Sequence, residues 1–151
     1  MRNRGRRRSP NQLRSVASPS ANQLRSQAIA AAESGGISDR EIGVMATLVQ
    51  TLPVFAGFTN DRLRHAADAA VALLRDEDGL DHAARLVRGA LEPRLRETAY
   101  TLACEVIAAE TQHGQAILQM LAFIGDSLHL DRLTIAAIER GTRARYQRMD
   151  A

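Results

Sequence analysis

Two stretches of the sequence bring acidic residues together with glycine: IAAAESGGISDREI at 29–42 and VIAAETQHGQAI at 106–117. Carboxylates beside a turn with free backbone carbonyls are the oxygen donors that Ca²⁺, Mg²⁺ and Mn²⁺ prefer. We expect weak binding, with a dissociation constant of about 10⁻⁴–10⁻³ M, as in calcium sites of low charge. The candidate ligands for this divalent cation, the only cofactor that the sequence suggests, are Glu33, Asp39, Glu41 and Glu110.

Helix capping is the alternative explanation for part of this pattern. The spacing Ser38-x-x-Glu41 is a capping box, in which each side chain binds a backbone amide at the start of a helix. An acid in the first helical turn, such as Asp39, also interacts favourably with the helix dipole. Capping explains neither Glu33 nor its counterpart Glu110, so both interpretations stay open at this point.

Most enzyme motifs are missing from the sequence. It has no glycine-rich phosphate loop, no GxSxG motif and no Cys or His at zinc-binding spacing. The one ExxH, from Glu110 to His113, lacks the second copy and the further glutamates that a di-iron bundle needs. Cys104 lies among apolar residues, where a thiol is usually an inert part of the core. We therefore expect a protein that is not an enzyme.

The net charge of +3 averages two unlike segments. Residues 1–32 hold seven Arg and no acid, whereas residues 33–151 hold thirteen Arg and seventeen acids. Within the basic segment, residues 1–21 are rich in Arg and Ser, and Pro10 and Pro19 exclude a continuous helix. These residues are expected to be a disordered tail, followed by one helical domain over residues 22–151. The tail alternatively binds nucleic acid or an anionic membrane, or acts as a transit peptide.

The same pentapeptide occurs in the tail and at the start of the predicted domain. SPNQLRS at 9–15 is echoed by SPSANQLRS at 18–26, a local duplication in low-complexity sequence.

From about residue 22 the hydrophobic periodicity predicts helices throughout. Helix starts are indicated by Ser38, Asn60, the neighbourhood of Asp81, Pro93 and Asp131. Residues 94–111 are apolar except for a narrow polar stripe, which is typical of a helix that other helices surround. We expect an all-α single compact bundle of about six or seven helices around this buried central helix. The stripe consists of Thr98, Thr101 and Glu105, and the residues expected to be almost fully buried are Met45, Leu102, Val106, Leu121 and Ile124.

The chain also contains an internal repeat. IAAAES at 29–34 lies over VIAAET at 106–111 when the sequence is shifted by 77 residues. When one extra residue is allowed in the first copy, its apolar residues align with those of the second: Ile42, Met45, Leu48 and Leu52 with Leu118, Leu121, Ile124 and Leu128. Each copy reads as a helix, a short acidic turn and an amphipathic helix, so we expect a pseudo-twofold arrangement.

At these residues the sequence resembles the TerB-like, tellurite-resistance group of all-helical domains. The group's pattern is a helix that ends in Ala-Ala-Asp-Gly, followed after a few residues by a glutamate that opens the next helix, and it occurs twice. Residues 31–41 carry the first copy with Glu33 in place of Asp, and residues 108–114 carry the second. LPVFAGF at 52–58, LRETAY at 95–100 and LDRLTIAAIERG at 130–141 are similar to the branch found in alpha-proteobacteria.

This resemblance covers about residues 26–148 and implies a non-catalytic helical domain linked to tellurite or general stress resistance. It also implies paired acidic turns that hold divalent cations. The second copy departs from the pattern, because Gln115, Ala116 and Ile117 stand where the helix-opening glutamate belongs. A lopsided site is therefore expected, with Glu110 assisting the three acids of the first copy.

Two functions follow as expectations. The first is a cytoplasmic stress-response domain that binds cations or a partner protein through its acidic turns. The second is an adaptor whose basic tail binds nucleic acid or an anionic membrane. A single cysteine excludes an internal disulfide, and no apolar run is long enough for a membrane span.

Overall fold

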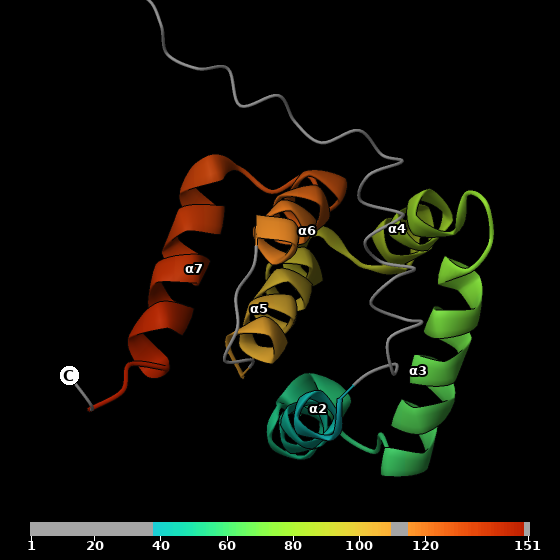
Figure 1. Cartoon of the computed structure of the whole chain (residues 1–151), viewed down its shortest axis with the longest axis horizontal. Coiled ribbons are helices and arrows are strands. Elements are labelled where there is room, and N and C mark those ends of the chain that lie inside the picture. Colours follow the sequence, from blue (N-terminus) through green and yellow to red (C-terminus); the bar gives the residue numbers. More distant parts are fainter. Residues whose placement is uncertain (1–37, 110–114, 150–151) are drawn as a thin grey trace, which may run out of the picture.

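The computed structural model describes residues 38–109 and 115–149, which form six α-helices and one short 3₁₀ helix. The described residues contain no strand, so the all-α prediction is confirmed. The basic tail, the boundary near residue 22, Glu33 and Glu110 lie outside the described residues. The elements are α2 (Asp39–Thr51), η1 (Pro53–Phe55), α3 (Asn60–Leu74), α4 (Gly79–Ala90), α5 (Pro93–Ala109), α6 (Gln115–Ser127) and α7 (Arg132–Arg145) (Figure 1).

Capping residues fix several of these helix starts. The predicted capping box is present, because Ser38 Oγ accepts the Glu41 amide at 3.1 Å and Glu41 Oε2 accepts the Ser38 amide at 2.7 Å. At α7, Asp131 Oδ1 accepts the amides of Leu133 and Thr134, both at 3.0 Å. These side chains replace the partners that the first amides of a helix lack. Both predicted caps are confirmed.

One predicted helix cap is wrong by one residue, and the helix start expected in the neighbourhood of Asp81 lies at Gly79. Thr59 caps α3, and Asn60 is already its first residue, because the Thr59 hydroxyl accepts the Arg62 amide at 3.3 Å. Helix α4 begins at Gly79, earlier than Asp81, and Asp78 precedes it without a side-chain cap. Pro93 does open α5. The first amides of a helix have no acceptor within the helix, so the missing amide hydrogen of proline costs no hydrogen bond there.

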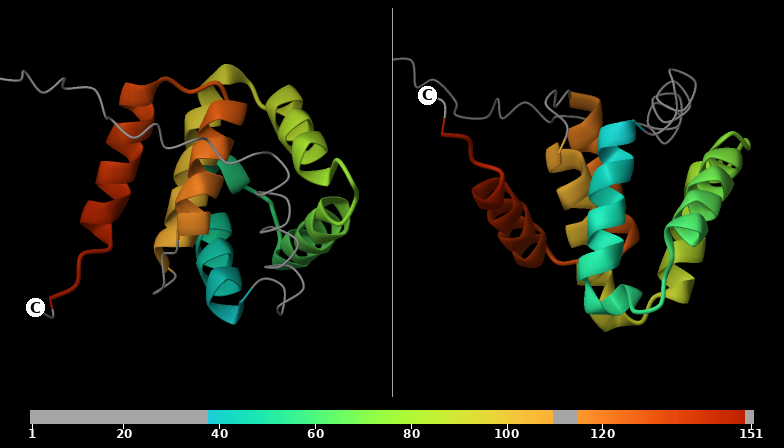
Figure 2. Two further views of the ribbon diagram at one scale, coloured as in Figure 1. Left: turned by 45° about the horizontal axis from the view of Figure 1, so that its top comes forward. Right: turned by 90° about the horizontal axis from the view of Figure 1, so that it is seen from below.

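Helix α5 is the central helix of the bundle. It packs against α2, α6 and α7, whereas α3 and α4 pack mainly against one another. Figure 2 shows α5 and α6 between α7 on one side and the α3–α4 pair on the other. The buried core joins α5 to α6 and to the turn after it through Tyr100, Cys104, Leu121 and Leu128.

The core is smaller than the sequence predicts. Of the five residues expected to be almost fully buried, only Leu121 is, with 8% of its surface exposed. Met45, Leu102 and Val106 are half-buried because they line an open apolar cavity between α2, α3 and α5. Ile124 is also half-buried and lines a second cavity, between α4, α5 and α6. None of the described helices combines the length and the apolar character that crossing a membrane requires.

Candidate functional site

The start of α2 carries the described part of the predicted cation site. Glu41 is already engaged in the capping box with Ser38. Asp39 is exposed, and no hydrogen bond or ion pair joins its carboxylate to another described residue. Of the two described acids, Asp39 therefore has both carboxylate oxygens available to a cation, whereas Oε2 of Glu41 already accepts the Ser38 amide.

The other two predicted ligands, Glu33 and Glu110, lie outside the described residues, as does the Gly35-Gly36 turn. Within residues 38–109 and 115–149, no three His, Cys, Asp or Glu side chains come close enough to hold a metal ion. The N-terminal ends of α2 and α6, which the two acidic stretches precede, point toward the same end of the bundle in both views of Figure 2. The four-acid site stays a prediction.

A second group of polar residues joins α5 to α7. The buried Tyr100 hydroxyl donates a hydrogen bond of 2.8 Å to Glu139 Oε1. Burial, and then this bond to a carboxylate, raise the pKa of Tyr100 well above its ordinary value of 10.0. The phenol is therefore a fixed donor at neutral pH.

Glu105 makes corresponding contacts nearer the C-terminal ends of the same two helices. Only 2% of its surface is exposed, and Tyr146 donates a hydrogen bond of 2.7 Å to its Oε2 atom. Arg145 Nη1 lies 2.7 Å from Glu105 Oε1. A buried carboxylate is tolerated only when its oxygens are paired in this way. Glu105 thus fixes the end of α7 on α5.

A cavity of about 360 Å³ is bounded by α5, α6 and α7, and Glu139 is one of its lining residues. Leu118 and Leu121 form its α6 side, and Cys104 lies on α5. On α7, the cavity is lined by Glu139, Thr142 and Arg143. Thr142 is 6% exposed, and no hydrogen bond joins its hydroxyl to another described residue. The volume and the mixed lining fit a small ligand.

The environment of Cys104 does not activate its thiol. Burial, and then the nearby Glu139 charge, raise the pKa of Cys104 from 9.0 to about 11. A reactive cysteine needs a lowered pKa, usually from a cation or a histidine. The described histidines are engaged or exposed elsewhere: His65 contacts the Asp61 carbonyl, His129 contacts Arg88, and His82 is exposed. Cys104 therefore has no histidine base among the described residues.

Sequence reasoning missed these contacts between α5 and α7. It placed Glu105 on a polar stripe of the central helix and assigned it no partner. One signal was available, because a carboxylate in an otherwise apolar helix needs a donor from elsewhere. The last helix is rich in arginine and is followed by Tyr146, but the sequence does not give the register between the two helices.

Comparisons with protein-family models, with curated proteins and with solved structures find no match to this chain.

Proposed function

We propose that this chain is a non-enzymatic TerB-like domain that takes part in tellurite or general stress resistance by binding. Its proposed ligand is a divalent cation, held weakly at the acidic turn before α2, and this turn is also the proposed contact for a partner protein. The supporting observation is Asp39, an exposed carboxylate beside the capping box with no partner among the described residues. Glu33 and Glu41 complete the proposed ligand set, and Glu110 assists.

The orientation of the helices supports a contribution from both acidic stretches. Helices α2 and α6 both start at the same end of the bundle (Figure 2). Glu110 precedes the first residue of α6, Gln115, by five positions in the sequence. A hard cation needs about six or more oxygen atoms, so ligands from two turns and from water are required.

Calorimetric titration of the full chain with Ca²⁺, Mg²⁺ and Mn²⁺ tests the cation proposal. We expect a dissociation constant of about 10⁻⁴–10⁻³ M for at least one ion. Glu33→Gln and Asp39→Asn should abolish the binding heat, because each removes a ligand charge without disturbing the Ser38–Glu41 cap. Asp61→Asn is the matched control, since Asp61 occupies the first turn of α3 in the same way. Absence of heat and of any rise in melting temperature at millimolar ion would overturn the proposal.

The second candidate function rests on the charge of the N-terminal segment. Seven Arg without an acid over residues 1–32 favour binding of a polyanion, either nucleic acid or an anionic membrane. Deletion of residues 1–21 distinguishes the two functions. Cation binding should survive the deletion, whereas salt-sensitive retention on a polyanion column should disappear.

A further inference from the structure

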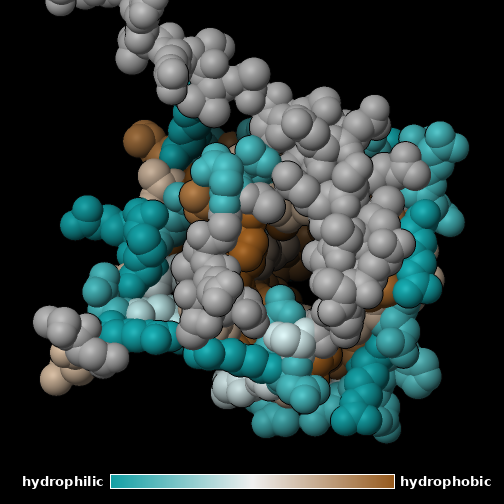
Figure 3. All heavy atoms as spheres, viewed as in Figure 1, coloured by the Kyte–Doolittle hydropathy of each residue, from teal (hydrophilic) through white to brown (hydrophobic). Residues whose placement is uncertain are grey.

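An apolar cavity lies between α2, η1, α3 and α5. This cavity has a volume of about 470 Å³, and the described residues that line it are all apolar. Figure 3 shows hydrophobic side chains at the bottom of a hollow on this face of the molecule. Its walls include Met45, Leu48, Phe55, Leu63, Leu102 and Val106.

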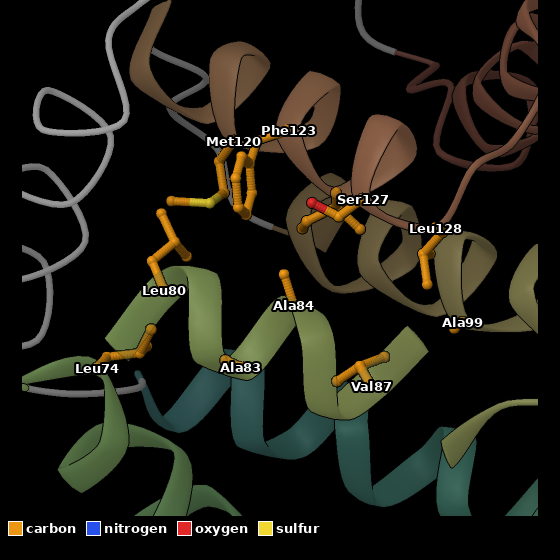
Figure 4. A pocket seen from close by; sticks show the side chains of 11 residues that line it. Leu74, Leu80, Ala83, Ala84, Val87, Ala99, Met120, Phe123, Ser127 and Leu128 are labelled. Atoms are coloured by element: carbon orange, nitrogen blue, oxygen red, sulfur yellow. The ribbon is translucent and has the colours of Figure 1, made fainter. Parts of the chain in front are cut away.

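A second apolar cavity, of about 310 Å³, shares two of these helices. Leu80 and Ala84 of α4 face Met120 and Phe123 of α6 across it (Figure 4). Leu74 of α3 and Ala99 of α5 also line it, so α3 and α5 take part in both cavities. On α3, Leu63, Ala66 and Leu74 share one helical face. Because residues of α3 and α5 line both cavities, the two cavities are here together called the α3–α5 groove.

An apolar groove of this size needs an occupant that excludes water. The nearest part of the chain is the segment directly before α2, because only residues 34–37 separate residue 33 from Ser38. An extended connection of this length reaches about 17 Å. A helix over residues 22–33 would be about 18 Å long, close to the length of α2, about 20 Å. The reach of residues 34–37 and the length of a helix over residues 22–33 are therefore both compatible with a position beside α2.

The correspondence between α2 and α6 indicates which face this segment covers. Asp39 and Gln115 are 76 residues apart, and so are Thr51 and Ser127, so the two helices have the same length and the predicted repeat register. Helix α5 precedes α6 and buries Leu121 against Tyr100 and Cys104. The residue that corresponds to Leu121 on α2 is Met45, which lines the groove instead of being buried. The segment that corresponds to the end of α5 is residues 22–32.

The composition of this segment suits a narrow apolar groove. Leu24, Ala28, Ile29 and Ala32 follow the i, i+4, i+5, i+8 pattern of one helical side. Alanine has the highest helix propensity and allows close approach of the backbone. Arg25 is the only charged residue before Glu33 in the segment.

We infer that residues 22–33 form an amphipathic helix that occupies the α3–α5 groove and completes the core of the domain. In this position the helix packs against α2 as α5 packs against α6.

Thiol labelling of the full chain tests this inference. Ala66→Cys places a thiol in the groove, and Ala69→Cys places one on the same helix outside it, at a position that is also exposed among the described residues. If residues 22–33 cover the groove, a thiol reagent should modify Ala69→Cys at least ten times faster than Ala66→Cys. Cys104 stays in place in both variants, because its buried thiol reacts slowly and reports global unfolding.

The duplicated pentapeptide supplies a matched control. Leu24 and Leu13 both occupy the centre of Asn-Gln-Leu-Arg-Ser, and only Leu24 belongs to the proposed helix. Leu24→Asp should raise the labelling rate of Ala66→Cys to that of Ala69→Cys, or unfold the chain so that Cys104 reacts as well. Leu13→Asp should leave both rates unchanged.

Three results would overturn the inference. The first is equal labelling of the two alanine positions in the otherwise native chain. The second is an equal effect of Leu13→Asp and Leu24→Asp. The third is protection of Ala66→Cys that disappears on dilution, which would assign the groove to a second copy of the chain. None of these results depends on cation binding, so the proposed function is tested separately.

Discussion

Tyr100 and Glu139 link the central helix to the last helix through a hydrogen bond of 2.8 Å, and a second tyrosine–glutamate pair makes the same link with the roles exchanged. In the first pair the donor is on α5, whereas in the second the donor, Tyr146, directly follows α7 and the acceptor, Glu105, is on α5. Each acid therefore has a phenol donor from the opposite helix. This reciprocal pairing sets the register between α5 and α7.

Tyr100→Phe removes the donor in the first pair and leaves the ring in place. We expect the free energy of unfolding to fall by about 1–3 kcal/mol, because the charged carboxylate of Glu139 loses its phenol donor at a partly buried position. Urea unfolding followed by circular dichroism measures the change. Leu133→Ala is the control, since Leu133 is 83% exposed and its truncation should change the stability by less than about 0.5 kcal/mol.

Arg145→Gln tests the second pair. Glu105 is buried, so the loss of its cation should destabilise the protein by about 1–2 kcal/mol, the lower range for a charged hydrogen bond because Arg145 itself is largely exposed. Arg143→Gln is the matched control on the same helix. Its contact with Glu139 is 4.0 Å long and solvent-exposed, so its removal should change the stability by at most about 0.5 kcal/mol. Equal effects of the two variants would contradict the structural role of Glu105.

The raised pKa values of Cys104 and Tyr100 predict a loss of stability in alkali. The pKa of Cys104 rises from 9.0 to about 11 in the folded chain, first because of burial and then because of Glu139. Above pH 9 the unfolded chain therefore releases this proton before the folded chain does, and unfolding becomes more favourable as the pH rises through 11. Tyr100 acts in the same direction from pH 10 upward.

Urea unfolding between pH 7 and pH 11 measures this dependence. Cys104→Ala should flatten the part of the curve between pH 9 and pH 10, where the thiol contributes and Tyr100 does not yet ionise in the unfolded chain. The wild-type curve and the variant curve should be parallel between pH 7 and pH 8. A slope between pH 9 and pH 10 that is identical in both proteins would show that another group is responsible.

Local signals allowed most of the secondary structure to be predicted. Ser38, Pro93 and Asp131 mark helix starts through hydrogen bonds or a missing amide within a few residues of themselves, so no tertiary knowledge is needed. The choice between Thr59 and Asn60 as the cap of α3 is less certain from sequence, because both residue types cap helices well.

Burial and the candidate site were harder to predict because both depend on how the helices pack. Leu133 lies two residues from Ile135, on nearly the opposite side of α7, and is exposed although it belongs to the same apolar run. Met45 follows the helical period correctly, but the period does not indicate how completely the facing surface is covered. The pairs that join α5 to α7 connect residues 39 and 41 positions apart in the sequence, and no local pattern links them.

The two ends of α4 give opposite predictions for the same glycine-to-alanine substitution. At Gly79 a Cβ atom would overlap the Leu73 carbonyl oxygen and lie 3.0 Å from Leu74 Cα. These are backbone atoms that close the turn between α3 and α4, and they have no other rotamer to adopt. Gly79→Ala should therefore destabilise the chain by about 2 kcal/mol or more, because the turn must open or the start of α4 must shift.

At Gly89 the same substitution should be favourable. No atom lies within 4 Å of the added Cβ, and the residue is exposed inside the helix. Alanine restricts the unfolded chain more than glycine does, so Gly89→Ala should stabilise the protein by about 0.5–1 kcal/mol. Thermal unfolding of both variants beside the wild type provides the measurement. A melting temperature that rises for Gly79→Ala would contradict the tight turn at Asp76–Gly79 that joins α3 to α4.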